Sequence, residues 1–260
     1  MSERIQADTL LLSDTHLGFG EHTAKWLLTI LPKYEFRRII FVGDTFHHYN
    51  FSLFSKAELE FLTWLCNLEP DVEVVILPGN HDPNPPATLK LMARCQVQIV
   101  TDGQYVWQHK GQSCVALHGD QFDPSLTQDK QYQDFLYWCE KKIRAIDRLV
   151  DWFVGRRQVL LSFFFNHPYW KQRLDNLSTK AMEFVKQTGH RFVFCGHVHQ
   201  PGFLVESSEL ADDTEILSTY INLGCWIDSD PVLGVIGSNG VELHHYSPAG
   251  ELIGVVCLAA

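Results

Sequence analysis

The chain of 260 residues is 45% hydrophobic, which is enough to bury a sizeable core, and we expect one domain spanning residues 1–260. Its 21 Lys and Arg residues against 31 Asp and Glu residues give a net charge of −10. This acidic balance argues against a general nucleic-acid binder, because such proteins carry a basic surface.

Targeting features point to a cytoplasmic protein. The N-terminus lacks a basic stretch followed by an apolar segment, and no apolar run reaches the roughly 18 residues of a membrane span. The seven cysteines show no C-x-x-C spacing, which is typical of small core residues in a reducing compartment.

The first third of the chain alternates predicted strands and helices. Apolar runs predict buried strands at residues 9–12, 38–42 and 72–77. Between the first two runs, apolar residues within 26–31 recur at helical spacing. Between the second and third, Ser55 and Glu58 form a capping box that predicts a helix ending near Leu68. This order predicts a βαβαβ unit.

The rest of the chain predicts further strands and one long interruption. Strands are expected at residues 104–108, 113–117 and 192–195, with three more between residue 220 and the C-terminus. Residues 123–190 break the alternation, because they are helical in period and rich in aromatic residues and arginines. We interpret them as a helical insertion into the α/β core.

Polar residues of the metal-ligand type directly follow five of the predicted strands. The blocks are SDTHLG with Asp14 and His16, GDTFHH with Asp44, GNHD with Asn80 and His81, LHGD with His118, and GHVH with His197 and His199. In an open α/β sheet, ligands gather outside the carboxyl ends of strands, so these side chains can converge. One such block alone is more often a hydrogen-bonded turn, but five in this order predict a dinuclear metal site.

The ligand types limit the metal and the reaction. Oxygen and imidazole donors without thiolate favour Mn²⁺, Fe²⁺ or Zn²⁺, and we expect two ions, with Mn²⁺ as the first choice. Asp44 stands alone on its loop, and its carboxylate can bridge two ions. Two ions about 3.5 to 4 Å apart activate water and stabilise an in-line displacement, which predicts hydrolysis at phosphorus.

In this order, the five blocks resemble the calcineurin-like metallophosphoesterase superfamily over residues 10–199. The resemblance implies an α/β fold in which a two-sheet sandwich is flanked by helices. It implies that one ion is held by Asp14, His16, Asp44 and His199, and the other by Asp44, Asn80, His118 and His197. His81 would lie outside the metal ligands and stabilise the transition state or protonate the leaving oxygen. Asp82 would either orient His81 or cap the loop before Pro83.

Within the superfamily, the chain is most similar to the UDP-2,3-diacylglucosamine hydrolase branch. This similarity rests on GHVHQP and on HGDQFDPSLTQDKQYQDF, LSTKAMEFV and INLGCWIDS at residues 118–135, 177–185 and 221–229. It implies cleavage of a pyrophosphate that releases a nucleoside monophosphate and a lipid sugar phosphate. The chain departs from this branch at three positions. The branch typically has an acidic residue where this chain has His47, and its best-known members have Arg where this chain has His81. At the position of Cys225 the branch often has Asp or Ala. These departures leave the predicted metal ligands unchanged and bear on which substrate the protein cleaves.

Residues 149–173 within the insertion carry many aromatic side chains interrupted by Arg156 and Arg157, and these charges exclude a transmembrane span. The segment is either a pair of amphipathic helices packed on the core or a lid that holds acyl chains and touches the inner face of the membrane peripherally. The lid predicts a phosphorylated small-molecule or lipid substrate. Candidate substrate-binding residues are Asp120, Asp123, Arg156 and Arg157. Instead of binding substrate, Asp120 and Asp123 would either orient His118 or cap a loop.

Two other functions stay open. A phosphodiesterase or nuclease of other specificity would use the same metal core, although the acidic charge argues against DNA as the substrate. A non-catalytic scaffold of the same fold would be expected to lose metal ligands. No predicted ligand is missing from the sequence, which favours an enzyme.

Overall fold

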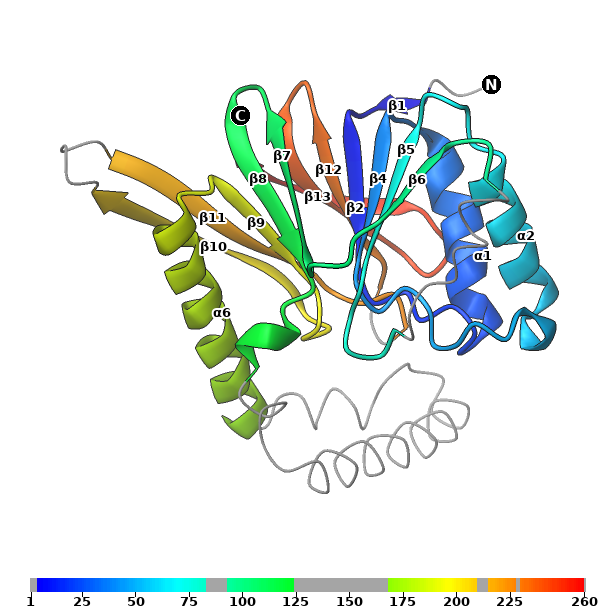
Figure 1. The fold of residues 1–260 in the computed structure, drawn as a ribbon, viewed down its shortest axis with the longest axis horizontal. Helices are drawn as coiled ribbons and strands as arrows, with labels where there is room; N and C mark the ends of the chain where they lie inside the picture. Colours follow the sequence, from blue (N-terminus) through cyan, green and yellow to red (C-terminus); the bar gives the residue numbers. More distant parts are fainter. Residues whose placement is uncertain (1–3, 83–92, 124–167, 210–214, 228–229, 260) are drawn as a thin grey trace.

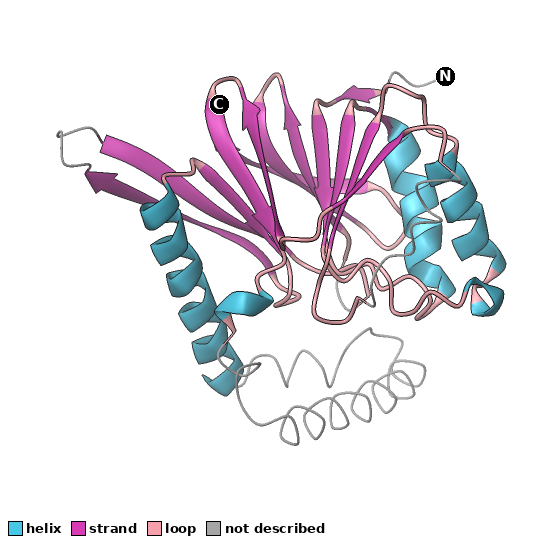
Figure 2. Cartoon of the chain, in the orientation of Figure 1, coloured by secondary structure: helices cyan, strands magenta, loops and turns pink. Residues whose placement is uncertain are grey.

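The computed structural model describes residues 4–82, 93–123, 168–209, 215–227 and 230–259. Two large β-sheets lie at its centre, with helices on their outer sides (Figures 1 and 2). Among the helices of these residues, none is both long and apolar enough to cross a membrane.

The first sheet has seven strands. Their order is β14 (Leu252–Ala259), β13 (Gly240–Tyr246), β12 (Val232–Gly237), β2 (Thr9–Leu12), β4 (Arg38–Val42), β5 (Glu73–Leu77) and β6 (Gln96–Ile99). The strands from β2 to β6 are parallel, and β12 joins β2 in the antiparallel sense. Apart from their first residues, Thr9 and Arg38, the central strands β2 and β4 are apolar, as expected for a sheet covered on both faces.

The second sheet has five strands. Their order is β10 (Pro201–Glu209), β11 (Glu215–Leu223), β9 (Phe192–Cys195), β8 (Gln112–Leu117) and β7 (Gln104–His109). The three central strands are parallel, and the two edge strands are antiparallel to their neighbours. A separate pair of short parallel strands is formed by β1 (Ile5–Gln6) and β3 (Tyr34–Glu35).

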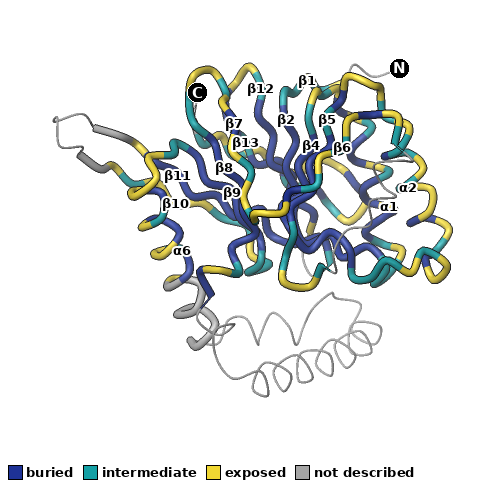
Figure 3. The backbone as a smooth tube through the Cα atoms, viewed as in Figure 1, coloured by how far each residue is buried: buried dark blue, intermediate teal, exposed yellow. Residues whose placement is uncertain are grey.

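Three layers of apolar side chains hold these elements together. Between the sheets, residues such as Leu11 and Ile40 pack with Phe194 from the second sheet. Helices α1 (Glu21–Ile30) and α2 (Lys56–Cys66) cover the outer face of the seven-stranded sheet. Helix α6 (Pro168–Thr188) covers the outer face of the five-stranded sheet. The buried centre of both sheets is dark blue in Figure 3. The α/β two-sheet sandwich flanked by helices is therefore confirmed.

The predicted elements agree with the structure in most places. The strands at residues 9–12, 38–42 and 192–195 have the predicted bounds, and the capping box of Ser55 and Glu58 opens α2 as expected. The sequence did not predict β1, β3, β6 or β10, and four strands, β11–β14, reach into the segment after residue 220 where three were expected. Strands β1 and β3 have only two residues each, and β6 (QVQI) alternates exposed and half-buried positions instead of forming an apolar run.

The range predicted as an insertion is described only in part. From residue 168 it forms α6, whose Leu177, Ala181, Met182 and Val185 are buried against the five-stranded sheet. These positions follow helical spacing, so this portion packs on the core. Residues 124–167, with Arg156 and Arg157, lie outside the described residues, and the lid stays a prediction.

Candidate metal centre

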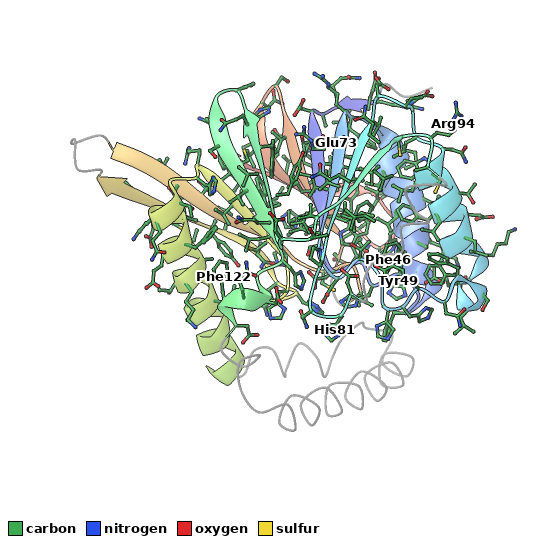
Figure 4. The ribbon with its side chains drawn as sticks, in the orientation of Figure 1. Phe46, Tyr49, Glu73, His81, Arg94 and Phe122 are labelled. Atoms are coloured by element: carbon green, nitrogen blue, oxygen red, sulfur yellow. The ribbon has the colours of Figure 1, made fainter. Side chains whose placement is uncertain are left out.

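The loops that carry the predicted ligands meet at one end of the sandwich. Those after β2, β4 and β5 come from the seven-stranded sheet, and those after β8 and β9 come from the five-stranded sheet. In Figure 4, His81 and Phe122 lie at this lower end, whereas Glu73 at the start of β5 lies at the opposite end. Parallel strands bring their carboxyl ends to one edge, which explains the convergence.

Two buried carboxylates lie at the centre of this cluster. Asp14 Oδ2 accepts hydrogen bonds from Ser13 Oγ at 2.6 Å and from the His197 amide at 2.9 Å. Asp44 Oδ1 accepts one from the His81 amide at 2.8 Å. One oxygen of each carboxylate is thus fixed by protein donors, while the other faces imidazole groups.

The remaining carboxylate oxygens lie close to three histidines. Asp14 Oδ1 is 3.2 Å from His199 Nε2 and 3.9 Å from His16 Nε2. Asp44 Oδ2 is 3.7 Å from His16 Nε2 and 3.4 Å from His118 Nε2. Asp44 therefore lies between two ligand groups, as a bridging carboxylate requires.

Asn80 connects the two histidines of the second predicted ion site. Its Oδ1 is 3.1 Å from His118 Nε2 and 3.1 Å from His197 Nδ1. All seven predicted ligands therefore gather in one cluster. Within it, Asp14, His16 and His199 form one group whose ligand atoms lie within 4.8 Å of one another, and Asp14, Asp44 and His118 form another.

The buried polar atoms of the cluster fit divalent cations. His16 Nε2 is buried and makes no hydrogen bond within the described structure, and Asp14 Oδ1 is buried with His199 Nε2 at 3.2 Å. Buried polar atoms are rarely left without a partner, because the loss of hydration is costly. Both atoms are ordinary metal ligands that face the same space, so a bound cation would satisfy them.

The electrostatics of the cluster also favour cations. Burial lowers the pKa of His16 to about 3, which favours the neutral imidazole that binds metal. Burial also acts to lower the pKa of His118, but the charges of Asp44 and Asp14 outweigh it and raise the pKa to about 10. The two carboxylates thus attract positive charge to this cluster, and a divalent cation supplies it.

The ligand loops have strained backbones. Asp14, His16, Asp44, His197 and His199 all have positive φ values, from 41° to 69°. In the described part of the chain, Lys110 is the one other non-glycine residue of this kind. Such conformations cost on the order of 1–3 kcal/mol each and persist where the surroundings enforce them, typically at functional sites.

Three glycines allow the ligand loops to approach one another. Gly43, Gly79 and Gly196 each directly precede a predicted ligand. An added Cβ would lie 2.3 Å from the His118 ring at Gly43, 2.2 Å from an Asp44 oxygen at Gly79 and 1.8 Å from Ser13 Oγ at Gly196. The glycine in these blocks is therefore a steric requirement of the cluster.

The two predicted catalytic residues have different surroundings. The side chain of His81 is exposed, and its ring centroid lies 5.5 Å from that of His16, so it borders the cluster from the solvent side. Asp82 accepts hydrogen bonds from the amides of Gly79, Thr45 and Phe46. These contacts match the loop-capping alternative for Asp82. Burial raises its pKa to about 7 despite the amides.

The structure describes two of the four predicted substrate-binding residues. Asp120 is half-buried at the start of the short helix η3 (Asp120–Phe122). Asp123 follows that helix, is buried, and lies 2.8 Å from His197 Nε2, so it contacts a different histidine from the predicted His118. Arg156 and Arg157 are outside the described residues.

Several supporting residues were not predicted. Ser13 Oγ lies 2.6 Å from both Asp14 Oδ2 and the Val42 carbonyl oxygen. Cys225 Sγ lies 3.5 Å from the Asp14 carbonyl oxygen, and Asn222 Nδ2 donates to the Gly196 carbonyl at 2.6 Å. The last two belong to the block INLGCWIDS, whose similarity to one branch, with a departure at Cys225, gave no indication of these contacts.

Comparison with known proteins places the chain in a family. Residues 8–201 match the family model of the calcineurin-like phosphoesterases, and the chain belongs to this family. Comparison with curated proteins finds no match.

Among solved structures, the chain is similar to an uncharacterised predicted phosphoesterase from Streptococcus pneumoniae, with 12% identity, a TM-score of 0.42, and coverage of 97% of this chain and 98% of the other. An archaeal phosphodiesterase is similar at 15% identity and a TM-score of 0.42, with 96% and 99% covered. Vps29 complexed with Zn²⁺ from Entamoeba histolytica is similar at 12% identity and a TM-score of 0.40, with 96% of each chain covered.

Proposed function

We propose that the chain is a metal-dependent hydrolase that cleaves a phosphate ester or pyrophosphate with two divalent ions. The convergence of the predicted ligands around Asp44, whose Oδ2 lies between His16 and His118, supports this proposal most directly. Membership of the calcineurin-like phosphoesterase family agrees with it.

The proposed ligand sets are those that the family resemblance implies. Asp14, His16, Asp44 and His199 would hold one ion, and Asp44, Asn80, His118 and His197 would hold the other. Bound divalent ions polarise the phosphoryl group and make water nucleophilic near neutral pH. Mn²⁺ is the first candidate, with Fe²⁺ and Zn²⁺ as alternatives.

The residues of the chain contribute positioning and a proton donor. The buried carboxylates are fixed by Ser13 and by the amides of His197 and His81, so their free oxygens keep one orientation. His81 is exposed beside the cluster, and we propose that its imidazole stabilises the transition state or donates a proton to the leaving oxygen.

The test is a metal-loading series. Protein stripped with a chelator is reloaded with Mn²⁺, Fe²⁺ or Zn²⁺, and both the ions bound per chain and the hydrolysis of a chromogenic phosphodiester are measured. We expect two ions per chain and no hydrolysis before reloading. Two bound ions without hydrolysis of any phosphoester in a broad screen would favour the scaffold alternative.

For the substrate, we propose a nucleoside diphosphate joined to an acylated sugar, with UDP-2,3-diacylglucosamine as the first candidate. The similarity of the blocks at residues 118–135, 177–185 and 221–229 to the branch that cleaves this compound supports the proposal, as do the aromatic residues and arginines of 149–173. The products would be a nucleoside monophosphate and a lipid sugar phosphate. The same aromatic segment would make peripheral contact with the membrane.

Acylation provides the test of this substrate. Each buried CH₂ contributes about 0.8 kcal/mol, so a protein that holds two acyl chains should prefer the acylated compound strongly over its deacylated analogue. Equal kcat/KM values for the two compounds would exclude the lipid substrate and leave a phosphodiesterase of other specificity.

A further inference from the structure

We propose that Asp123 is a positioning residue that holds the His197 ring so that its Nδ1 atom is the metal ligand. The inference rests on the proposed metal centre and assigns Asp123 a role there in place of substrate binding. It also gives the HGDQFD block two functions, since His118 in the same block is a predicted ligand.

The contact itself is short and buried. Asp123 Oδ2 lies 2.8 Å from His197 Nε2, and the side chains are 0% and 8% exposed. The other ring nitrogen, Nδ1, lies 3.1 Å from Asn80 Oδ1 within the ligand cluster. A neutral imidazole has one N–H group and one lone pair, so a carboxylate that accepts the N–H at Nε2 leaves the lone pair at Nδ1.

The neighbouring histidine presents its opposite nitrogen. His118 Nδ1 lies 3.1 Å from the Val42 carbonyl oxygen, which leaves Nε2 facing Asn80 and Asp44. The two rings meet edge to face, with centroids 5.3 Å apart. To bind one ion together, His118 must use Nε2 and His197 must use Nδ1, so the two rings must be opposite tautomers. The Val42 carbonyl accepts at His118 Nδ1 and the Asp123 carboxylate accepts at His197 Nε2, and these acceptors select the two tautomers.

The local backbone explains how Asp123 reaches His197. Gly119 has a φ of 105°, which turns the chain sharply after His118 and starts helix η3. The Asp123 amide then donates to the Asp120 carbonyl at 3.0 Å. Phe122 is buried with residues of α6 and the five-stranded sheet, which anchors this turn. Asp123 is thereby held beside the loop that follows β9.

A substrate-binding role for Asp123 predicts a different outcome. The side chain is fully buried and its Oδ2 is engaged with His197, so little of it is accessible to a substrate. If Asp123 acts through His197, its substitution changes metal affinity. If it binds substrate, its substitution raises KM and leaves metal affinity unchanged.

The experiment compares Asp123→Asn with a matched control. Asparagine keeps the size and one acceptor but removes the charge. Glu242→Gln makes the same change at another carboxylate that contacts an imidazole Nε2, that of His244, at 2.9 Å. Mn²⁺ affinity is measured by titration against a chelating indicator. We expect Asp123→Asn to bind one ion about 10–100-fold more weakly, the range typical for partners of ligating histidines, and the control to match the wild type.

A second set of measurements excludes an indirect effect. In a His197→Ala background, Asp123→Asn should cause no further loss of affinity, because its target is gone. On the unsubstituted protein loaded with Zn²⁺, the nitrogen NMR shifts of His197 should report metal at Nδ1. Metal at Nε2, or unchanged affinity in Asp123→Asn, would overturn the inference. A wild-type protein that binds no ion would instead refute the metal centre itself.

Discussion

The two sheets contribute different chemistry to the candidate metal centre. The seven-stranded sheet supplies the oxygen ligands, which are Asp14, Asp44 and Asn80, together with His16. The five-stranded sheet supplies imidazoles alone, which are His118, His197 and His199. The negatively charged ligands are thus confined to the loops of one sheet. A bound cation would be coordinated both by the carboxylates of the seven-stranded sheet and by the neutral imidazoles of the five-stranded sheet.

The two groups of ligands are also fixed in different ways. Asp14 and Asp44 are held by donors, namely the Ser13 hydroxyl and backbone amides. His118 and His197 are held by acceptors, the Val42 carbonyl and the Asp123 carboxylate. Donors favour the charged form of a carboxylate, whereas an acceptor selects one tautomer of a neutral imidazole. The loss of a ligand should therefore have a different effect on each side.

The largest expected effect is that of Asp44→Ala. Because Asp44 lies between both ligand groups, its removal should release both ions and reduce phosphoesterase activity by roughly 10³-fold or more, as expected when several kcal/mol of metal-derived stabilisation are lost. His118→Ala, on the other sheet, should release only one ion. Elemental analysis of the two variants measures this difference.

The control for these variants is His190→Ala, since His190 precedes β9 and lies at the opposite end of that strand from His197. It should keep two ions and full activity. Two ions retained by Asp44→Ala would contradict a bridging role, and two ions lost in His118→Ala would contradict the division between the sheets.

The next effect is expected for His81→Ala. Its side chain is exposed beside the cluster while its backbone amide, which the substitution keeps, donates to Asp44 Oδ1. We therefore expect both ions to remain and kcat to fall by about 10² to 10⁴-fold, the usual contribution of a positioned acid. Loss of an ion in this variant would show that His81 supports the metal centre instead of the substrate.

The ligands and central strands could be predicted because their signals are local. Apolar runs such as 38–42 encode strands buried on both faces, and each polar block follows its strand directly. The glycines of these blocks were visible as well, although their role depends on contacts between loops distant in sequence, as between Gly196 and Ser13.

The contacts that orient the ligands could not be predicted from the sequence in the same way. Asp123 and His197 are far apart in the chain, and their contact depends on a turn at Gly119 and on the packing of the five-stranded sheet. The sequence suggested that Asp123 orients a histidine but indicated His118, its neighbour in sequence. Similarly, Ser13 gave no signal of its own, because the Val42 carbonyl that it also contacts comes close only when β2 pairs with β4.

A smaller effect is expected at Gly196, where a loop of the five-stranded sheet lies close to a loop of the seven-stranded sheet. A Cβ at residue 196 would lie 1.8 Å from Ser13 Oγ and 2.3 Å from Asp14 Oδ2, so Gly196→Ala should force the loops apart and destabilise the protein by about 1–3 kcal/mol, as overpacked sites do. Urea unfolding measures this change. Gly202→Ala is the matched control, because a Cβ there meets no atom within 4 Å. Equal stability of the two variants would show that the loops can separate freely.

The smallest expected effect is that of Ser13→Ala. The Ser13 hydroxyl has one proton to donate to the Asp14 carboxylate or to the Val42 carbonyl, and each of these acceptors keeps another donor, the His197 amide and His118 Nδ1 respectively. Because no acceptor loses its last partner, we expect a loss of only about 1 kcal/mol in the free energy of unfolding, with both ions still bound. The control is Ser52→Ala, whose exposed hydroxyl bonds Asn50 and should matter by less than about 0.5 kcal/mol. A released ion in Ser13→Ala would show that the His197 amide cannot hold Asp14 by itself. The carboxylate side of the centre would then depend on its hydroxyl as strongly as we expect the imidazole side to depend on Asp123.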